Sequence, residues 1–302
     1  MRRRAVGREP TLSRRGVALR ILKEHDASGG ILKSYIFLMH PGPSVLVSLV
    51  TAAGVVVAAA GSVPGTRVGL VAAVMLCAQC SIGALNDVCD LPRDRLVQRY
   101  KPLVRSPISR QDALVAALGL GGLAVALAAT AGGGMLPATL GGLGAGMAYD
   151  VGFKRTPLSA IPWWGGFLAL SAFISAGAGH AAAISMPTVA LTAPLAVGLH
   201  CANALPDIAA DRQTGAWSLP ALLGPERSRT VAVAGTLTAL FLAPSMWLLT
   251  GSHPGAASIC LYTLGGVTLG AAVAGRSFGR PHGPLAVGSA LVALAWFASL
   301  PP

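Results

Sequence analysis

Long apolar stretches, separated by short polar or glycine-rich breaks, follow one another along the chain from about residue 35 onward. A helix needs about 20 apolar residues to cross the ~30 Å hydrocarbon core of a bilayer. Reading the breaks at Gly, Pro and charged residues, we predict nine membrane-spanning helices. They fall at about residues 35–61, 66–86, 112–131, 133–150, 158–179, 185–204, 230–250, 256–274 and 283–300. The predicted fold class is all-α, a polytopic membrane bundle whose single membrane domain covers residues 35–302.

Composition excludes a soluble globule, because only 11% of the 302 residues are charged and 53% are hydrophobic, whereas soluble domains carry roughly 25% charged residues. Charge also indicates the orientation. With the amino terminus in the cytoplasm, every one of the 23 Lys and Arg residues except Arg67 falls on the cytoplasmic side, as the positive-inside rule expects. The bias toward Ala, Gly, Val and Arg favours a GC-rich bacterium, so we expect a multi-pass protein of the bacterial plasma membrane.

Residues 1–34 form a basic segment, with nine Lys or Arg residues and three acidic ones. No short apolar core with a small-residue cleavage site follows, so we do not expect a secretory signal. A basic arm beside a membrane span is more typical of contact with anionic lipid than of nucleic-acid binding. We therefore predict a cytoplasmic tail, with membrane lipids as partners and no nucleic acid.

Cysteine usage offers little chemistry, although Cys77 and Cys80 form a C-x-x-C pair inside an apolar run. Redox or zinc chemistry would need a second ligand pair or a thioredoxin-like setting. Neither is visible, so we interpret the two residues as packing positions.

Acidic residues cluster in two short segments, NDVCDLPRD at 86–94 and NALPDIAAD at 203–211, which hold five of the 11 acidic residues. Their Asn and Asp residues recur at i, i+4 and i+8: Asn86, Asp90 and Asp94 in the first segment, and Asn203, Asp207 and Asp211 in the second. On a helix, each triplet lines one face. We expect the two triplets to face a shared cavity, with Asp87 as a fourth oxygen ligand in the first.

Clustered carboxylates repel one another unless a cation neutralises them. Oxygen ligands without His or thiolate select Mg²⁺, Mn²⁺ or Ca²⁺, and Mg²⁺ is usually held by a few carboxylates together with substrate phosphates. Basic residues lie close by, including Lys101, Arg105 and Lys154. The pattern therefore predicts a site for Mg²⁺ and a diphosphate on the cytoplasmic face.

These motifs resemble those of the UbiA-type intramembrane prenyltransferases. NDVCDLPRD resembles that family's NDxxDxxxD motif and DIAAD resembles its DxxxD motif. YDVGFK, with Tyr149 and Lys154, and KPLVRSPIS, from Lys101, are similar to two further elements of the family. The resemblance implies a bundle around a central cavity with a cytoplasmic cap, in which an isoprenyl diphosphate ionises and a small lipophilic or aromatic acceptor captures the cation.

Carried onto this chain, the resemblance implies roles for twelve residues. The metal ligands would be Asn86, Asp87, Asp90, Asp94, Asn203, Asp207 and Asp211. Asp87, Asp90, Asp207, Asp211, Lys154 and Tyr149 would be catalytic, and Asn86, Asn203, Lys101, Arg105 and His40 would bind substrate.

Two alternatives to a transferase stay open from the sequence. A UbiA-type terpene cyclase uses the same ionisation without an acceptor. A cation transporter also places acids in helices, but usually near the membrane midplane. Many family members have Arg-Pro where this chain has His40-Pro41, which argues against an aromatic acid as the acceptor. His40 is then either a base or polar contact in the cavity or a histidine that is simply hydrogen-bonded, and the sequence leaves both alternatives open.

Overall fold

The computed structural model describes residues 30–97, 101–105, 107–180, 184–251, 254–274 and 282–298. Most of the predicted tail (1–34) lies outside these residues, as do residues 275–281 in the predicted connection between the eighth and ninth spans. Every regular element in the described ranges is helical, which confirms the all-α fold class. The labelled α-helices are α2 (Pro41–Ala58), α3 (Gly65–Val97), α4 (Pro102–Arg105), α5 (Arg110–Ala131), α6 (Met135–Val151), α7 (Ala160–Gly177), α8 (Met186–Ala204), α9 (Ile208–Gln213), α10 (Leu219–Leu223), α11 (Pro225–Thr250), α12 (Ala256–Ala274) and α13 (His282–Phe297), and a 3-10 turn, η1, spans Phe153–Arg155.

Five of these helices, α2, α3, α5, α7 and α11, are both long and apolar enough to cross a membrane. The other long helices of the described residues are α6, α8, α12 and α13, each of 16 to 19 residues. The described helices therefore match the nine predicted spans in order. The nine-span count itself stays a prediction.

Several predicted boundaries are wrong, for reasons of local backbone chemistry. The first span is not one helix, because His40 adopts a left-handed conformation (φ 47°) between the helical residues 30–38 and α2. Pro41 follows it, and a residue before proline is disfavoured in the right-handed helical region. The second span does not end at residue 86, since α3 continues through Pro92 to Val97. The seventh begins at Pro225 rather than 230, with proline in the first turn, where its missing N–H costs no hydrogen bond.

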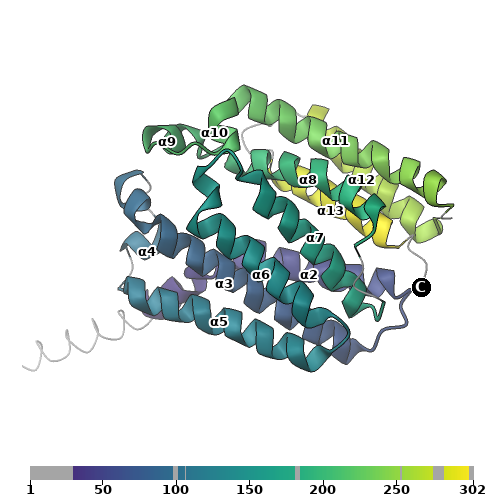
Figure 1. The fold of residues 1–302 in the computed structure, drawn as a ribbon, viewed down its shortest axis with the longest axis horizontal. Coiled ribbons are helices and arrows are strands. Elements are labelled where there is room, and N and C mark those ends of the chain that lie inside the picture. The colour runs from purple at the N-terminus through teal and green to yellow at the C-terminus, as the bar shows by residue number, and fades with distance from the viewer. Residues whose placement is uncertain are drawn as a thin grey trace, which may run out of the picture.

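Six long helices surround a central cavity of about 970 Å³. Side chains from α2, α3, α6, α7, α8 and α13 line it, whereas α5, α11 and α12 contribute no lining residue among those described. In Figure 1 the short helices α4, α9 and α10 lie at one end of the bundle, drawn at the left. The cavity therefore has an end close to these short helices and an end far from them.

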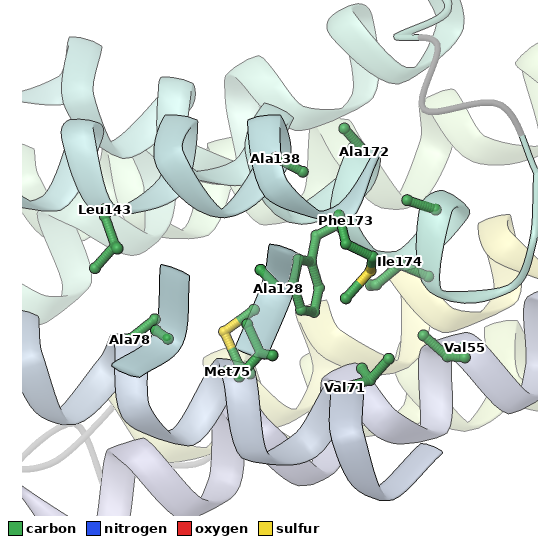
Figure 2. Packing of buried hydrophobic residues seen from close by; sticks show 14 of the residues in the cluster. Val55, Val71, Met75, Ala78, Ala128, Ala138, Leu143, Ala172, Phe173 and Ile174 are labelled. Carbon is green, nitrogen blue, oxygen red and sulfur yellow. The ribbon is translucent and has the colours of Figure 1, made fainter. Parts of the chain in front are cut away.

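The far end of the cavity is lined by an apolar cluster that includes residues of α3 and α7. Figure 2 shows Phe173 and Ile174 projecting between Met75 of α3 and Val55 of α2. Phe173, Ile174 and Met75 belong both to this buried cluster and to the cavity lining. The cavity floor is thus a packed hydrophobic core.

Small residues allow close helix packing, as the glycine-rich sequence predicts. A Cβ atom on Gly146 of α6 would lie 2.5 Å from Cδ1 of Ile82 in α3, and one on Gly235 of α11 would lie 3.0 Å from Cα of Gly198 in α8. A side chain at position 146 would require Ile82 to move, whereas one at position 235 would meet the backbone of α8 and force the two helices apart.

Candidate active site

Charged and amide side chains gather at the end of the cavity near the short helices. The polar and charged residues that line this end come from α2, α3, α6, α8 and α9 and from the connections between helices: His40, Asn86, Asp90, Arg93, Lys101, Tyr149, Asp150, Lys154, Arg155, Asn203, Asp207 and Asp211. Most of the remaining lining residues are apolar. The cavity therefore combines an ionic end with hydrophobic walls and a hydrophobic floor.

The first acidic motif lies on one continuous helix, as its spacing predicts. Asn86, Asp90 and Asp94 all fall within α3, and Asn86 and Asp90 line the cavity. Asp87 and Asp94 are buried and do not appear among the described lining residues. Both contact the ammonium group of Lys101, at 3.5 Å from Asp87 and 2.8 Å from Asp94. These two acids therefore lie behind the cavity surface, where they hold a cation.

The second motif does not lie on one helix, so that prediction is wrong. Helix α8 ends at Ala204 and α9 begins only at Ile208. Pro206 explains the break, because it lacks an N–H to continue the helix and disfavours helical geometry in the residue before it. Asn203, Asp207 and Asp211 nevertheless all line the same cavity. The predicted convergence of the two motifs therefore holds without the predicted helical register.

Three cations neutralise the acids. The Lys154 ammonium is 2.7 Å from Asp90 and 3.8 Å from Asp150, and the Arg93 guanidinium is 2.6 Å from Asp211. Burial raises the pKa of the Asp211 carboxyl, and Arg93 acts in the opposite direction. Burial alone would lower the pKa of Lys101, but the carboxylates of Asp94 and Asp87 raise it overall. Lys101 is therefore held in its charged form.

Asp150 is a site residue that sequence reasoning missed. It is 3% exposed, lines the cavity, and accepts a hydrogen bond of 2.7 Å from Nδ2 of Asn86. Its position near the end of an apolar helix, directly after Tyr149, is the same signal that identified the two motifs. The residue was missed because it stands alone and lacks the i, i+4, i+8 repeat.

His40 contacts the acidic cluster from the start of α2. Its Nε2 lies 3.2 Å from Oδ2 of Asp87, and its imidazole packs over Gly83, whose Cβ would lie 3.0 Å from the ring. The left-handed backbone of His40 is unusual for a residue with a side chain, and such strain is concentrated at functional sites. Among the other predicted residues, Tyr149 lines the cavity, whereas Arg105 is exposed at the end of α4 and lies outside the described lining.

A buried hydrogen-bond network attaches the segment with α9 and α10 to the bundle. Ser159 Oγ lies 2.9 Å from Nε2 of His200 and accepts a 3.0 Å hydrogen bond from the backbone N–H of Leu219. The backbone N–H of Trp217 donates to the carbonyl of Arg155 at 3.0 Å. The His200 ring also packs against Tyr149. These contacts place the second motif over the ionic end of the cavity.

The donor set suits a hard divalent cation. The described residues contain no group of three or more His, Cys, Asp or Glu side chains arranged to hold a metal. Mg²⁺ does not require one, since it keeps several water ligands and is usually bound through one or two carboxylates and substrate phosphates. Asp90 on α3 and Asp207 and Asp211 beyond α8 supply carboxylates from both motifs around one cavity. The residues present therefore fit Mg²⁺ better than zinc, which favours His and Cys.

The fold and the site define a polytopic helical membrane protein with an ionic site at the end of a deep apolar cavity. A family model described as the UbiA prenyltransferase family matches residues 47–286. A digeranylgeranylglyceryl phosphate synthase from Pyrococcus abyssi (strain GE5 / Orsay) is 30% identical over 219 residues, or 69% of this chain and 76% of the relative. The chain therefore belongs to the UbiA prenyltransferase family, and it is a membrane-embedded prenyltransferase.

Solved structures share the fold. A UbiA homolog from Archaeoglobus fulgidus bound to DMAPP and Mg²⁺ is 18% identical with a TM-score of 0.64, covering 86% of this chain and 99% of the homolog. A UbiA homolog from Aeropyrum pernix K1 is 20% identical with a TM-score of 0.64, covering 88% of this chain and 96% of that one. The shared architecture thus extends over nearly the whole of both homologs.

Proposed function

We propose that this protein transfers an isoprenyl group, in a Mg²⁺-dependent reaction, from an isoprenyl diphosphate to a small lipophilic acceptor within the membrane. The observation that carries the proposal is the cavity, whose carboxylates and cations gather at one end of otherwise apolar walls. Such a cavity is complementary to a molecule with a polyanionic head and a hydrocarbon tail. The Archaeoglobus fulgidus homolog supports this assignment, because it was solved with DMAPP and Mg²⁺ and also with GPP and Mg²⁺.

In this proposal the metal is bound by the oxygen ligands that line the cavity: Asn86, Asp90, Asn203, Asp207 and Asp211. When bound, Mg²⁺ neutralises charge on the diphosphate and makes it a better leaving group. We assign Asp87 and Asp94 a supporting role, because their described contacts are with His40, Lys101 and Arg93.

The cations and the apolar walls have separate tasks. Lys101 and Lys154 line the ionic end, where they stabilise the negative charge that develops on the departing diphosphate. Tyr149 lies on the cavity wall beside Trp163, and we assign its ring a place beside the isoprenyl chain. The hydrophobic walls exclude water, which would otherwise capture the allylic cation. Arg105 would contribute to diphosphate binding only through the positive electrostatic potential near the ionic end of the cavity.

The acceptor and the orientation in the membrane also belong to the proposal. His40 lines the cavity, and an imidazole lacks the fixed charge and planar fork of donors with which a guanidinium binds a carboxylate. We therefore propose a neutral acceptor rather than an aromatic acid. We further propose that the protein lies in a bacterial plasma membrane. We place the amino terminus and the ionic end of the cavity on the cytoplasmic side, because the basic loops share one face of the bundle.

The test uses Asp90→Asn and Asp207→Asn in the full chain, purified in detergent and incubated with Mg²⁺ and prenyl diphosphates of several lengths. Both variants should lose turnover while remaining folded, and EDTA should abolish wild-type turnover until Mg²⁺ is restored. Asp112→Asn is the matched control, because Asp112 belongs to the cap of α5, away from the described cavity lining. Turnover within about threefold of wild type in both site variants would refute the metal assignment. A cyclic product formed without any acceptor would instead identify a cyclase.

A further inference from the structure

Arg93 is a buried cation in the site to which the sequence motifs assign no role. It follows Asp90 by three residues on α3 and therefore faces the same side of the helix. Its side chain is 8% exposed and lines the cavity. Lys and Arg are almost never buried to this degree without a partner that requires their charge. The burial of Arg93 therefore calls for an explanation.

Arg93 joins the two acidic motifs. One terminal nitrogen, Nη2, lies 2.6 Å from Oδ1 of Asp211, and the other, Nη1, lies 3.7 Å from Oδ1 of Asp94. The contact with Asp211 connects α3 to α9, which are separated by the whole length of α5 to α8. By contrast, Lys101 contacts Asp87 and Asp94, and Lys154 contacts Asp90 and Asp150. The guanidinium therefore stands at the junction of the two motifs.

These contacts leave part of the guanidinium unused. Arginine carries five N–H donors in a planar fork, and Nε of Arg93 is buried without a hydrogen-bond partner among the described residues. A buried donor without a partner is costly, and a donor of a charged group more so. A donor of this kind on a cavity-lining side chain points to an anionic ligand in the cavity.

We propose that Arg93 binds the diphosphate group of the substrate directly, through N–H donors that its ion pair with Asp211 leaves available. The inference rests on the proposed function, since it concerns the leaving group of that reaction. When the C1–O bond of the isoprenyl diphosphate breaks, its electron pair stays on the diphosphate oxygen and C1 bonds to the acceptor, whose proton passes to the released diphosphate. Arg93 stabilises the charge that accumulates on that oxygen.

The geometry of arginine matters to this role. A guanidinium can donate two parallel hydrogen bonds to a phosphate, whereas the lysine ammonium acts as a compact point charge. Arg93 can thus contact Asp211 along one edge and diphosphate oxygens along another. Lysine at the same position would keep the charge and the contact with Asp211 but not the second edge.

The experiment measures binding of inorganic diphosphate in the presence of Mg²⁺ to the full chain in detergent by isothermal titration calorimetry, together with kcat and KM for an isoprenyl diphosphate. We expect Arg93→Gln to weaken diphosphate binding by about 10- to 100-fold, the range for a lost charged hydrogen bond. Arg110→Gln removes the same charge from an exposed position at the start of α5 and should stay within about twofold of wild type. Thermal unfolding of each variant shows whether it is folded.

Arg93→Lys decides the case if Arg93→Gln does not fold. Its diphosphate affinity should fall by about threefold or more if the fork touches diphosphate, and should match wild type if Arg93 only neutralises Asp211. Wild-type affinity in Arg93→Lys, or in a folded Arg93→Gln, would overturn the inference. These outcomes differ from failure of the proposed function, in which the wild-type protein itself would neither bind diphosphate with Mg²⁺ nor turn over any isoprenyl diphosphate.

Discussion

The ion pair between Lys154 and Asp90 gives a prediction that the structure makes quantitative. Their charged atoms are 2.7 Å apart, and the two side chains are only 12% and 8% exposed. Asp150, with a fully buried side chain, lies 3.8 Å from the same ammonium. Replacing Lys154 by Met keeps the length and apolar stem of the side chain but leaves two buried carboxylates without this cation.

Removing one partner of a buried ion pair typically costs about 3–5 kcal/mol, because the remaining charge has lost its solvent and its counter-charge. We therefore expect Lys154→Met to lower the free energy of unfolding by about 3 kcal/mol, toward the lower end since Lys154 keeps some exposure. Asp90→Asn in the same chain removes one of the stranded carboxylates. The double variant should therefore be more stable than the sum of the single effects predicts, by about 1–3 kcal/mol.

The assay is equilibrium unfolding of the four proteins of this cycle in mixed detergent micelles, followed by circular dichroism in the absence of substrate. Lys33→Met is the matched control, because Lys33 is exposed outside the cavity, and it should change stability by less than about 0.5 kcal/mol. A loss below about 1 kcal/mol for Lys154→Met, with additive effects in the double variant, would refute the reasoning. That result would mean that water solvates the Asp90 carboxylate, or that another cation neutralises it, when Lys154 is absent.

Three further predictions test other parts of the molecule. Arg67 donates to the carbonyls of Gly177, Ala176 and Ala131 at 2.7, 2.7 and 3.2 Å. Arg67→Met should therefore destabilise the protein by about 2–4 kcal/mol in the same unfolding assay. A loss under about 1 kcal/mol would show that water takes over these hydrogen bonds. An impermeant maleimide should label Cys at position 156 only from the cytoplasmic side and Cys at position 130 only from outside, and the reverse pattern would invert the topology. Product analysis should find 4-hydroxybenzoate poorly prenylated, because His40 offers no fixed positive charge for its carboxylate, and efficient prenylation would show that other cations bind the acid.

Local patterns predicted the features that depend on local chemistry. The first acidic motif sits in an apolar run with no proline before Pro92, so its i, i+4, i+8 spacing was read correctly as one face of a helix. The second has the same spacing but contains Pro206, whose effect on Leu205 and on the helical hydrogen bonds ends α8 early. The spacing predicts one helical face only where no proline interrupts the helix, so it fails in the second motif.

The segment with α9 and α10 could not be predicted in detail, because contacts with the rest of the bundle hold it in place. Helices as short as α9 and α10 are not stable alone, and no apolar periodicity marks them in the sequence. Arg212 Nε donates to the carbonyl of Ala221 at 2.6 Å, and the N–H of Trp217 donates to the carbonyl of Arg155. The contact between Trp217 and Arg155 joins distant parts of the sequence, so no local pattern predicts it. The choice of partner for Arg93 has the same origin, since Asp94 is its sequence neighbour but Asp211 is closer in space.

The balance of charge in the site explains why a divalent cation belongs to the proposed reaction. In the ion pairs of the described residues, five carboxylates share three lysine and arginine cations: Asp87, Asp90, Asp94, Asp150 and Asp211 with Arg93, Lys101 and Lys154. The carboxylates of this set exceed its lysine and arginine cations by two, so a diphosphate approaching it alone would be repelled. A divalent cation held by the carboxylates that line the cavity would cancel that excess. Arg93, Lys101 and Lys154 would therefore contact the diphosphate only when a divalent cation offsets the remaining carboxylate charge.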